Sequence, residues 1–177
     1  MTGITRKTRG FTIVELLIVI VVIAILAAIT IVAFNGVQDR AKKSKVDADL
    51  SSLIKAIQMA RTAANGTLLS ITGNGCTRCS CPYTNGDTTN YSTLPKTNSC
   101  WTVYAATLDK IATVSGVNLD PLKNGDPWGA PYAIDENEGE AGGCGYDSLW
   151  SFGSSSNQNG GTAYGNKTIS HYGPVCT

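Results

Sequence analysis

An apolar run at residues 16–34 constrains the fold of this chain more than any other feature. The run has about the 20 residues that a helix needs to cross a bilayer, and Thr30 is its one polar residue. Glu15 stands directly before it. A carboxylate at the edge of a membrane helix is costly and usually has a partner and a function. The sequence therefore predicts a membrane-spanning helix that carries a functional acid at its start.

Two simpler interpretations compete for this segment, a cleaved secretory signal and a plain signal anchor. Both begin with basic residues, and this chain has Arg6, Lys7 and Arg9 there. Residues 24–28 also resemble a small-residue cleavage site. A signal peptide, however, has an apolar region of about 7–15 residues and no embedded acid. The length of the run and the acid before it therefore disfavour a cleaved signal.

Gly10, Phe11 and Glu15, with cations before them and the apolar run after them, resemble the class III leader and N-terminal helix of type IV pilins and type II secretion pseudopilins. The resemblance implies that a prepilin peptidase cuts after Gly10 and that Phe11 becomes an N-methylated N-terminus. It also implies that the subunit is stored in the membrane and that an assembly platform then polymerises it into a filament.

The chemistry of such a cut explains a role for the acid. Cleavage leaves a protonated ammonium on Phe11, four residues before the carboxylate of Glu15. In a lipid-like interior, an acid of one subunit and an amine of its neighbour attract each other far more strongly than in water. We expect this pair to set the register between subunits, as one buried polar residue does in a coiled coil.

Removal of the leader also changes the charge of the chain. The chain has 14 Lys and Arg against 13 Asp and Glu, and three of the cations lie in residues 1–10, which leaves 14 minus 3, or 11, cations. The mature chain is then neutral to slightly acidic, which argues against bulk attraction to nucleic acid. No specific nucleic-acid site is predicted.

The cysteines indicate the orientation in the membrane. Cations flank the span on both sides, so their number does not choose a side. All six cysteines lie beyond the span, at Cys76, Cys79, Cys81, Cys100, Cys144 and Cys176. Such a density fits an oxidising exterior. We therefore expect a single-pass protein of the inner (cytoplasmic) membrane, with its N-terminus in the cytoplasm, that later reaches the surface in a filament.

Three disulfides are the predicted state of these cysteines. Fifteen connectivities are possible for six cysteines, and nearness in sequence suggests Cys144 with Cys176 as one pair. Zinc held by thiolates is the alternative interpretation. The oxidising compartment and the distance in sequence of His171 disfavour it, so no metal and no cofactor are predicted.

The pattern of apolar residues extends the helix beyond the span. Positions with helical spacing are Val46, Leu50, Leu53, Ile54, Ile57, Ala60 and Ala64. The pair Asn65-Gly66 is a helix stop. The predicted organisation is a cleaved leader at 1–10, a transmembrane and assembly half of the helix at 11–36, an amphipathic half at 37–64 and an extracytoplasmic globular domain at 65–177.

The globular domain is expected to be small and mixed. A second helix is predicted at residues 100–114, capped by Asn98 or Ser99, because its apolar residues have near-helical spacing. Two strands are expected at residues 132–134 and 149–152, and a third at 168–172. The fold class is thus α+β, with a long N-terminal helix packed on a small antiparallel sheet in a disulfide-rich, pilin-like domain.

Two later segments resemble the major pseudopilins of type II secretion. They are the turn at residues 126–132 and the tripeptide at 151–153. In that family a calcium loop with acidic ligands follows, whereas residues 154–157 here are Ser-Ser-Ser-Asn and Asp147 is the one nearby acid. Calcium needs carboxylate ligands, so a calcium site is not predicted. Many pilins also carry a proline in the membrane helix; the first here is Pro82, which leaves residues 35–36 as the candidate for local melting.

The sequence carries no recognisable catalytic constellation, so the chain is predicted not to be an enzyme. It lacks Gly-x-Ser-x-Gly, His-Glu-x-x-His and phosphate-loop motifs. The predicted function is that of a structural subunit of a type IV pilus-like filament. One alternative is a pseudopilin of a type II secretion system, and another is a membrane-tethered binding domain that does not polymerise. The expected partners are other copies of the subunit, the prepilin peptidase, the assembly platform and the membrane.

Overall fold

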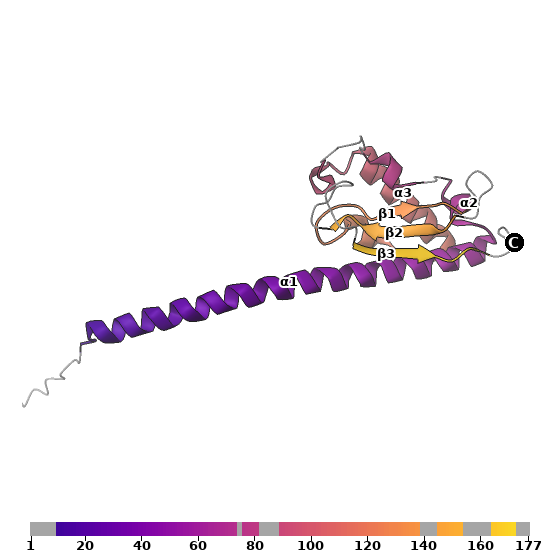
Figure 1. Cartoon of the computed structure of the whole chain (residues 1–177). Helices are drawn as coiled ribbons and strands as arrows, with labels where there is room; N and C mark the ends of the chain where they lie inside the picture. The colour runs from indigo at the N-terminus through magenta and orange to yellow at the C-terminus, as the bar shows by residue number, and fades with distance from the viewer. Residues whose placement is uncertain (1–9, 74–75, 82–88, 139–144, 154–163, 173–177) are drawn as a thin grey trace, which may run out of the picture. The chain divides into compact units, whose positions relative to one another are not determined.

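The computed structural model describes residues 10–73, 76–81, 89–138, 145–153 and 164–172. It divides into two compact units, Met1–Ala41 and Lys42–Thr177. The second unit is called the head below. The order of elements along the chain is α1, α2, η1, η2, α3, η3, β1, β2 and β3 (Figure 1).

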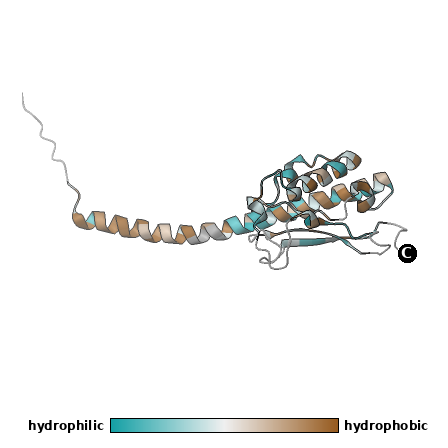
Figure 2. Ribbon diagram, turned by 90° about the horizontal axis from the view of Figure 1, so that it is seen from above, coloured by the Kyte–Doolittle hydropathy of each residue, from teal (hydrophilic) through white to brown (hydrophobic). Residues whose placement is uncertain are grey.

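Helix α1 runs from Ile13 to Ala64 and contributes to both units. Between residues 16 and 34 it is built almost wholly of apolar residues, which Figure 2 shows as a brown stretch. In the head it buries one stripe of side chains, which are Val46, Leu50, Leu53, Ala56, Ile57 and Ala60. The helix ends where Asn65 adopts a left-handed φ of 49°, as the Asn65-Gly66 pair predicts. The globular unit therefore includes the second half of α1 as well as the residues after it.

Two further helices cover the core of the head. Helix α3, Ser99–Ser115, has Asn98 as its N-cap, whose side chain accepts from the Cys100 backbone N–H at 2.9 Å. Helix α2, Leu68–Thr72, is too short to show a period and was not predicted. Three short 3-10 helices complete the helical elements of the described residues: η1 Arg78–Ser80, η2 Tyr91–Thr93 and η3 Asp120–Asn124.

The strands form one antiparallel sheet in the order β1-β2-β3. They are β1 Ala133–Asp135, β2 Asp147–Ser151 and β3 Tyr164–Ile169. Ile134 pairs with Leu149, and Leu149 pairs with Lys167. The expectation of an α+β fold with a long apolar helix and a small antiparallel sheet is confirmed.

The third strand starts earlier than the sequence predicts. Residues 168–172 were expected, whereas β3 begins at Tyr164 and ends at Ile169. The cause is Gly165, which has a φ of 68° and would normally indicate a turn. A Cβ at this position would lie 3.0 Å from Leu50 and 3.1 Å from Val46. The glycine therefore permits β3 to pack closely on α1, alongside which it runs in Figure 1.

The main core of the head lies between α1, α3 and the sheet. Helix α3 supplies Trp101, Tyr104, Leu108 and Ile111, and the sheet side supplies Tyr132, Ile134, Leu149 and Ile169. Side chains from the helices and from the sheet, far apart in the sequence, therefore pack together in one core.

The turn at residues 126–132 is organised around one buried carboxylate. Asp126 Oδ1 accepts the backbone N–H groups of Trp128 at 3.0 Å and Ala130 at 2.9 Å. Its Oδ2 accepts from the Ser151 hydroxyl at 2.5 Å. Burial raises the pKa of Asp126, and the hydrogen bond from Ser151 opposes that rise. Asp126 thus ties the turn before β1 to the end of β2.

Candidate assembly segment and the polar cluster of the head

The predicted processing site lies just before α1. Gly10 is exposed, and a Cβ built on it would meet nothing within 4 Å. Phe11 is 85% exposed. The two residues on either side of the expected cut are therefore open to solvent. Residues 1–9 lie outside the described part of the chain.

Thr12 and Glu15 form a reciprocal pair at the start of α1. The backbone N–H of Glu15 donates to Thr12 Oγ1 at 3.2 Å. Glu15 Oε2 accepts from the Thr12 backbone N–H at 2.8 Å and from its hydroxyl at 2.7 Å. This is a capping box, in which an N-cap threonine and a glutamate three residues later satisfy each other's backbone donors.

The capping box gives Glu15 a local role that the sequence argument missed. The pattern Thr-x-x-Glu before an apolar run is its signature and could have identified it. The two hydrogen bonds that the Glu15 carboxylate accepts from Thr12 both use Oε2. A carboxylate can accept about four hydrogen bonds. The carboxylate of Glu15 can therefore cap its own helix and still receive an ammonium from another subunit.

Among the described residues, no part of the chain covers the apolar half of α1. Its large apolar side chains are between 47% exposed, at Val21, and 84% exposed, at Ile13. Within the described residues, α1 is the one helix with the length and apolarity to cross a membrane, and none of its most apolar window is buried. Such a surface must be covered by lipid or by other helices.

The described cysteines form two disulfides, Cys76–Cys79 and Cys81–Cys100. Since a disulfide sulfur is not a thiolate, these four residues do not provide the zinc site considered as an alternative. The suggested pair of Cys144 with Cys176 lies outside the described residues.

A polar cluster of Arg61, Glu138 and Asp147 is buried in the head. Arg61 is 2% exposed, and both acids are fully buried. The Arg61 Nη2 atom contacts Asp147 Oδ2 and lies 2.9 Å from Glu138 Oε2, and Nη1 donates to the Ser170 carbonyl at 2.9 Å. Residues from α1, β2 and the segment after β3 therefore meet at one cation.

The two oxygens of Asp147 have different partners within the head. Its Oδ1 accepts the backbone N–H groups of Asn137 at 2.8 Å and Glu138 at 2.9 Å. Burial raises the pKa of Asp147, while the Glu138 N–H and the Arg61 guanidinium pull it down. Its oxygens are engaged inside the protein. Sequence reasoning missed this cluster because Arg61 and Asp147 are 86 positions apart in the sequence.

His171 lies flat against an aromatic ring. Its ring stacks on Tyr146, with centroids 4.2 Å apart and planes 9° apart. Among the described residues, no group of three or more His, Cys, Asp and Glu could hold a metal ion.

The chain is similar to one family model and to two known proteins. Residues 5–31 match the model of the prokaryotic N-terminal methylation motif. The chain is 40% identical over 60 residues to the type IV narrow pilus major component of Thermus thermophilus, which covers 34% of this chain and 52% of that protein. It is 38% identical over 55 residues to the type II secretion system core protein G of Escherichia coli, which covers 31% of this chain and 38% of that protein. No solved structure matches the chain significantly.

These matches confirm the predicted resemblance to the type IV pilin and pseudopilin family. They support a pilin-like or type II secretion pseudopilin role, and neither relative is named as an enzyme. The motif and the apolar half of α1 together indicate membrane anchoring. The chain spans about half the length of the first relative and less of the second.

Proposed function

We propose that this chain is the structural subunit of a type IV pilus-like surface filament. In this account a prepilin peptidase cuts after Gly10, and an assembly platform polymerises the mature subunit through its N-terminal helix. The observation that carries the proposal is the methylation motif at residues 5–31. The motif overlaps an apolar helix whose side chains are exposed in the part of the chain that the structure describes. In a filament, the helices of neighbouring subunits cover these side chains.

The proposed assembly contact joins Phe11 and Glu15 of different subunits. Cleavage creates an ammonium on Phe11, and Glu15 retains capacity to accept hydrogen bonds beyond its capping bonds. In a filament, the apolar helices of neighbouring subunits would surround the pair, and in such surroundings charges attract each other strongly and a missing partner is costly. A subunit that docks in the wrong register leaves its acid unpaired. The contact therefore selects one axial position for each new subunit.

Before assembly the subunit would be held in the inner membrane by the apolar half of α1. The N-terminus would lie in the cytoplasm and the head outside, where its cysteines are oxidised. The alternative role of a type II secretion pseudopilin is favoured by the similarity to core protein G. Both roles use the same cut and the same helix, and they differ in the length of the fibre that forms.

Replacement of Gly10 by valine should block processing. The peptidase of this family must accommodate a small residue before the scissile bond, so Gly10→Val should leave residues 1–10 attached and accumulate precursor in the membrane. Gly36→Val is the matched control, since a Cβ at Gly36 also meets nothing within 4 Å. Intact mass of the membrane protein reports the cut. Normal cleavage of Gly10→Val, or a wild-type chain that begins near Ala28 or Ala33, would contradict the proposal.

A further inference from the structure

The two described disulfides have different surroundings. Cys81 and Cys100 are 5% and 0% exposed and lie in an apolar cluster with Tyr91 and Phe152. In the other pair, Cys79 is exposed at the surface while Cys76 is 8% exposed. The Cys76–Cys79 bond is called the surface disulfide below. A reagent in solution can reach one of its two residues without any opening of the head.

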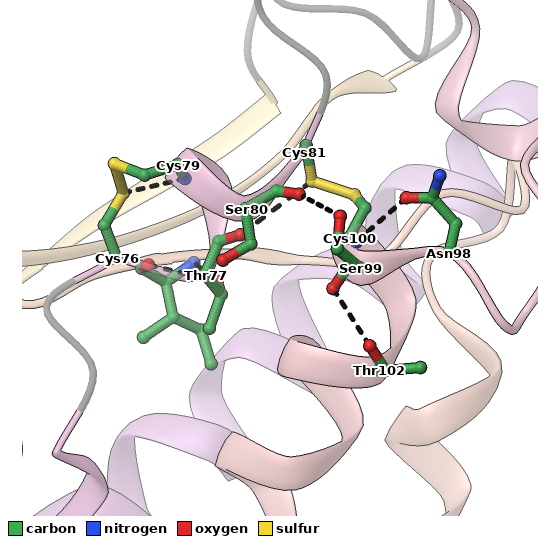
Figure 3. Close-up of a disulfide and its surroundings, with 10 residues drawn as sticks. Cys76, Thr77, Cys79, Ser80, Cys81, Asn98, Ser99, Cys100 and Thr102 are labelled. Atoms are coloured by element: carbon green, nitrogen blue, oxygen red, sulfur yellow. Dashed lines mark hydrogen bonds between the residues drawn. A yellow bond between two sulfur atoms is a disulfide. The ribbon is translucent and has the colours of Figure 1, made fainter.

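The segment that carries the surface disulfide is held in place by other bonds. Thr77 donates its backbone N–H to the Ile134 carbonyl at 2.9 Å, and its hydroxyl accepts the Ile134 N–H at 2.9 Å. At the other end, the Ser99 hydroxyl donates to the Ser80 carbonyl at 2.8 Å (Figure 3). These bonds join the segment to β1 and to α3. They do not depend on the surface disulfide, so the segment can keep its place when that bond opens.

The surface disulfide also constrains the unfolded chain less than its neighbour does. It joins residues three positions apart, whereas Cys81 and Cys100 are 19 positions apart. The entropy that a disulfide removes from the unfolded chain grows with the length of the loop it closes. Of these two bonds, Cys81–Cys100 therefore stabilises the fold more. The surface disulfide contributes little to the stability of the fold, and its presence needs another explanation.

The surface disulfide has a stabilised leaving group. The backbone N–H of Cys79 donates to Cys76 Sγ at 3.0 Å (Figure 3). A hydrogen bond to sulfur favours the thiolate over the thiol, and a better thiolate leaves faster in exchange. Attack on the exposed residue, Cys79, would expel the sulfur of Cys76 directly onto this donor. The exposure and the hydrogen bond thus favour the same direction of attack.

We propose that the surface disulfide is a thiol–disulfide exchange site whose substrate is an extracytoplasmic dithiol, and that Cys81–Cys100 is the permanent staple of the head. One thiolate of the dithiol attacks Cys79 Sγ, a new sulfur–sulfur bond forms there, and the old bond breaks with its electron pair on Cys76 Sγ, which takes up a proton. The second thiol of the dithiol loses its proton and attacks the first sulfur of the same dithiol, which is bonded to Cys79 in the mixed disulfide. The bond to Cys79 breaks, and the released Cys79 Sγ takes up a proton. The chain gains two electrons and two protons, and the dithiol becomes a cyclic disulfide. The extracytoplasmic location rests on the proposed function, whereas the chemistry does not.

Reduction of the full-length chain in detergent micelles by dithiothreitol tests the order of opening. Samples are alkylated at intervals, and the labelled cysteines are identified by peptide mass. Cys76 and Cys79 should be labelled at least about tenfold sooner than Cys81 and Cys100, with the near-ultraviolet circular dichroism unchanged over that time. Labelling of all four together, or loss of the dichroism with the first label, would overturn the proposal. Fibres are not measured, so this result is independent of the filament proposal.

Single-cysteine variants test the direction of attack. Cys76→Ser leaves the exposed thiol, and Cys79→Ser leaves the buried one. The first should react with an aromatic disulfide reagent at least about tenfold faster than the second. Equal rates or the reverse order would contradict attack at Cys79. The double variant, Cys76→Ser with Cys79→Ser, should fold, as judged by its dichroism; a misfolded double variant would show that the segment depends on the bond and would overturn the exchange site.

Discussion

Fibres should disappear when Glu15 is replaced by glutamine. Glutamine keeps the capping box, because its side-chain oxygen can still accept from Thr12, but it removes the charge that the Phe11 ammonium of a neighbouring subunit would meet. An ammonium left unpaired in an apolar interior costs about 3 kcal/mol or more, which lowers the docking constant at least about a hundredfold. Electron microscopy of cells at wild-type expression should show almost no fibres. Membrane levels and cleavage after Gly10 should be largely retained.

Two companion variants separate the pairing role of Glu15 from its capping role. Glu15→Val removes both the charge and the capping bond and should also abolish fibres. Thr12→Ala removes the capping hydroxyl, keeps the charge, and costs roughly 1 kcal/mol of helix stability, so fibres should persist. If glutamine at position 15 gave normal fibres while Thr12→Ala lost them, Glu15 would act by capping and the pairing mechanism would be wrong.

The head should lose much of its stability when Arg61 is replaced by methionine. This change leaves the fully buried Glu138 and Asp147 without the cation that lies between them. Removal of one member of a buried ion pair typically costs about 3–5 kcal/mol, a large share of the roughly 5–15 kcal/mol of a typical domain. Thermal unfolding of the full chain in micelles should shift down by roughly 10–20 °C.

An exposed ion pair supplies the control for Arg61. Lys167 Nζ lies 3.3 Å from Asp47 Oδ1, with the two side chains 40% and 50% exposed. Lys167→Met should cost less than about 1 kcal/mol, because exposed pairs contribute little. A loss of similar size in Arg61→Met would mean that the buried cluster contributes no more than a surface contact.

The deficit of Arg61→Met should depend on pH. Burial raises the pKa of Asp147, and Arg61 opposes the rise, so removal of the arginine raises the folded pKa further. A group with a raised folded pKa contributes stability below its unfolded pKa and loses it as the pH rises through the folded value. The deficit should therefore be largest near neutral pH and shrink toward about pH 4. A deficit that stays constant across this range would contradict the electrostatic explanation.

The two long helices, α1 and α3, were predictable from local signals. The apolar stripe from Val46 to Ala60 and the stop at Asn65 define the second half of α1, and Asn98 defines the start of α3. Periodicity and caps are properties of neighbouring residues, so one sequence contains them. The predicted bounds of β3 were wrong because Gly165 resembles a turn residue in the sequence. A glycine is needed at this position for close packing on α1, which is a long-range contact.

Local sequence patterns indicate candidate functional residues only where these are neighbours in the sequence. Gly10, Phe11 and Glu15 lie within one short motif, and a family model matches it. Arg61, by contrast, follows Ile57 by four residues and so lies on the buried stripe of α1, but the sequence around it does not indicate which acids it pairs with. Its partners come from segments that the fold brings together, and no local pattern in the sequence joins them.

Fibres sheared from cells that produce this chain provide the most direct measurement of the central claim. The N-terminal peptide of the fibre protein, identified by mass spectrometry, should begin at Phe11 and carry one added methyl group. Long recoverable fibres would match the pilus, and short ones would match the pseudopilus. Recovery of the chain only as a membrane monomer, with residues 1–10 still attached, would contradict assembly through the N-terminal helix.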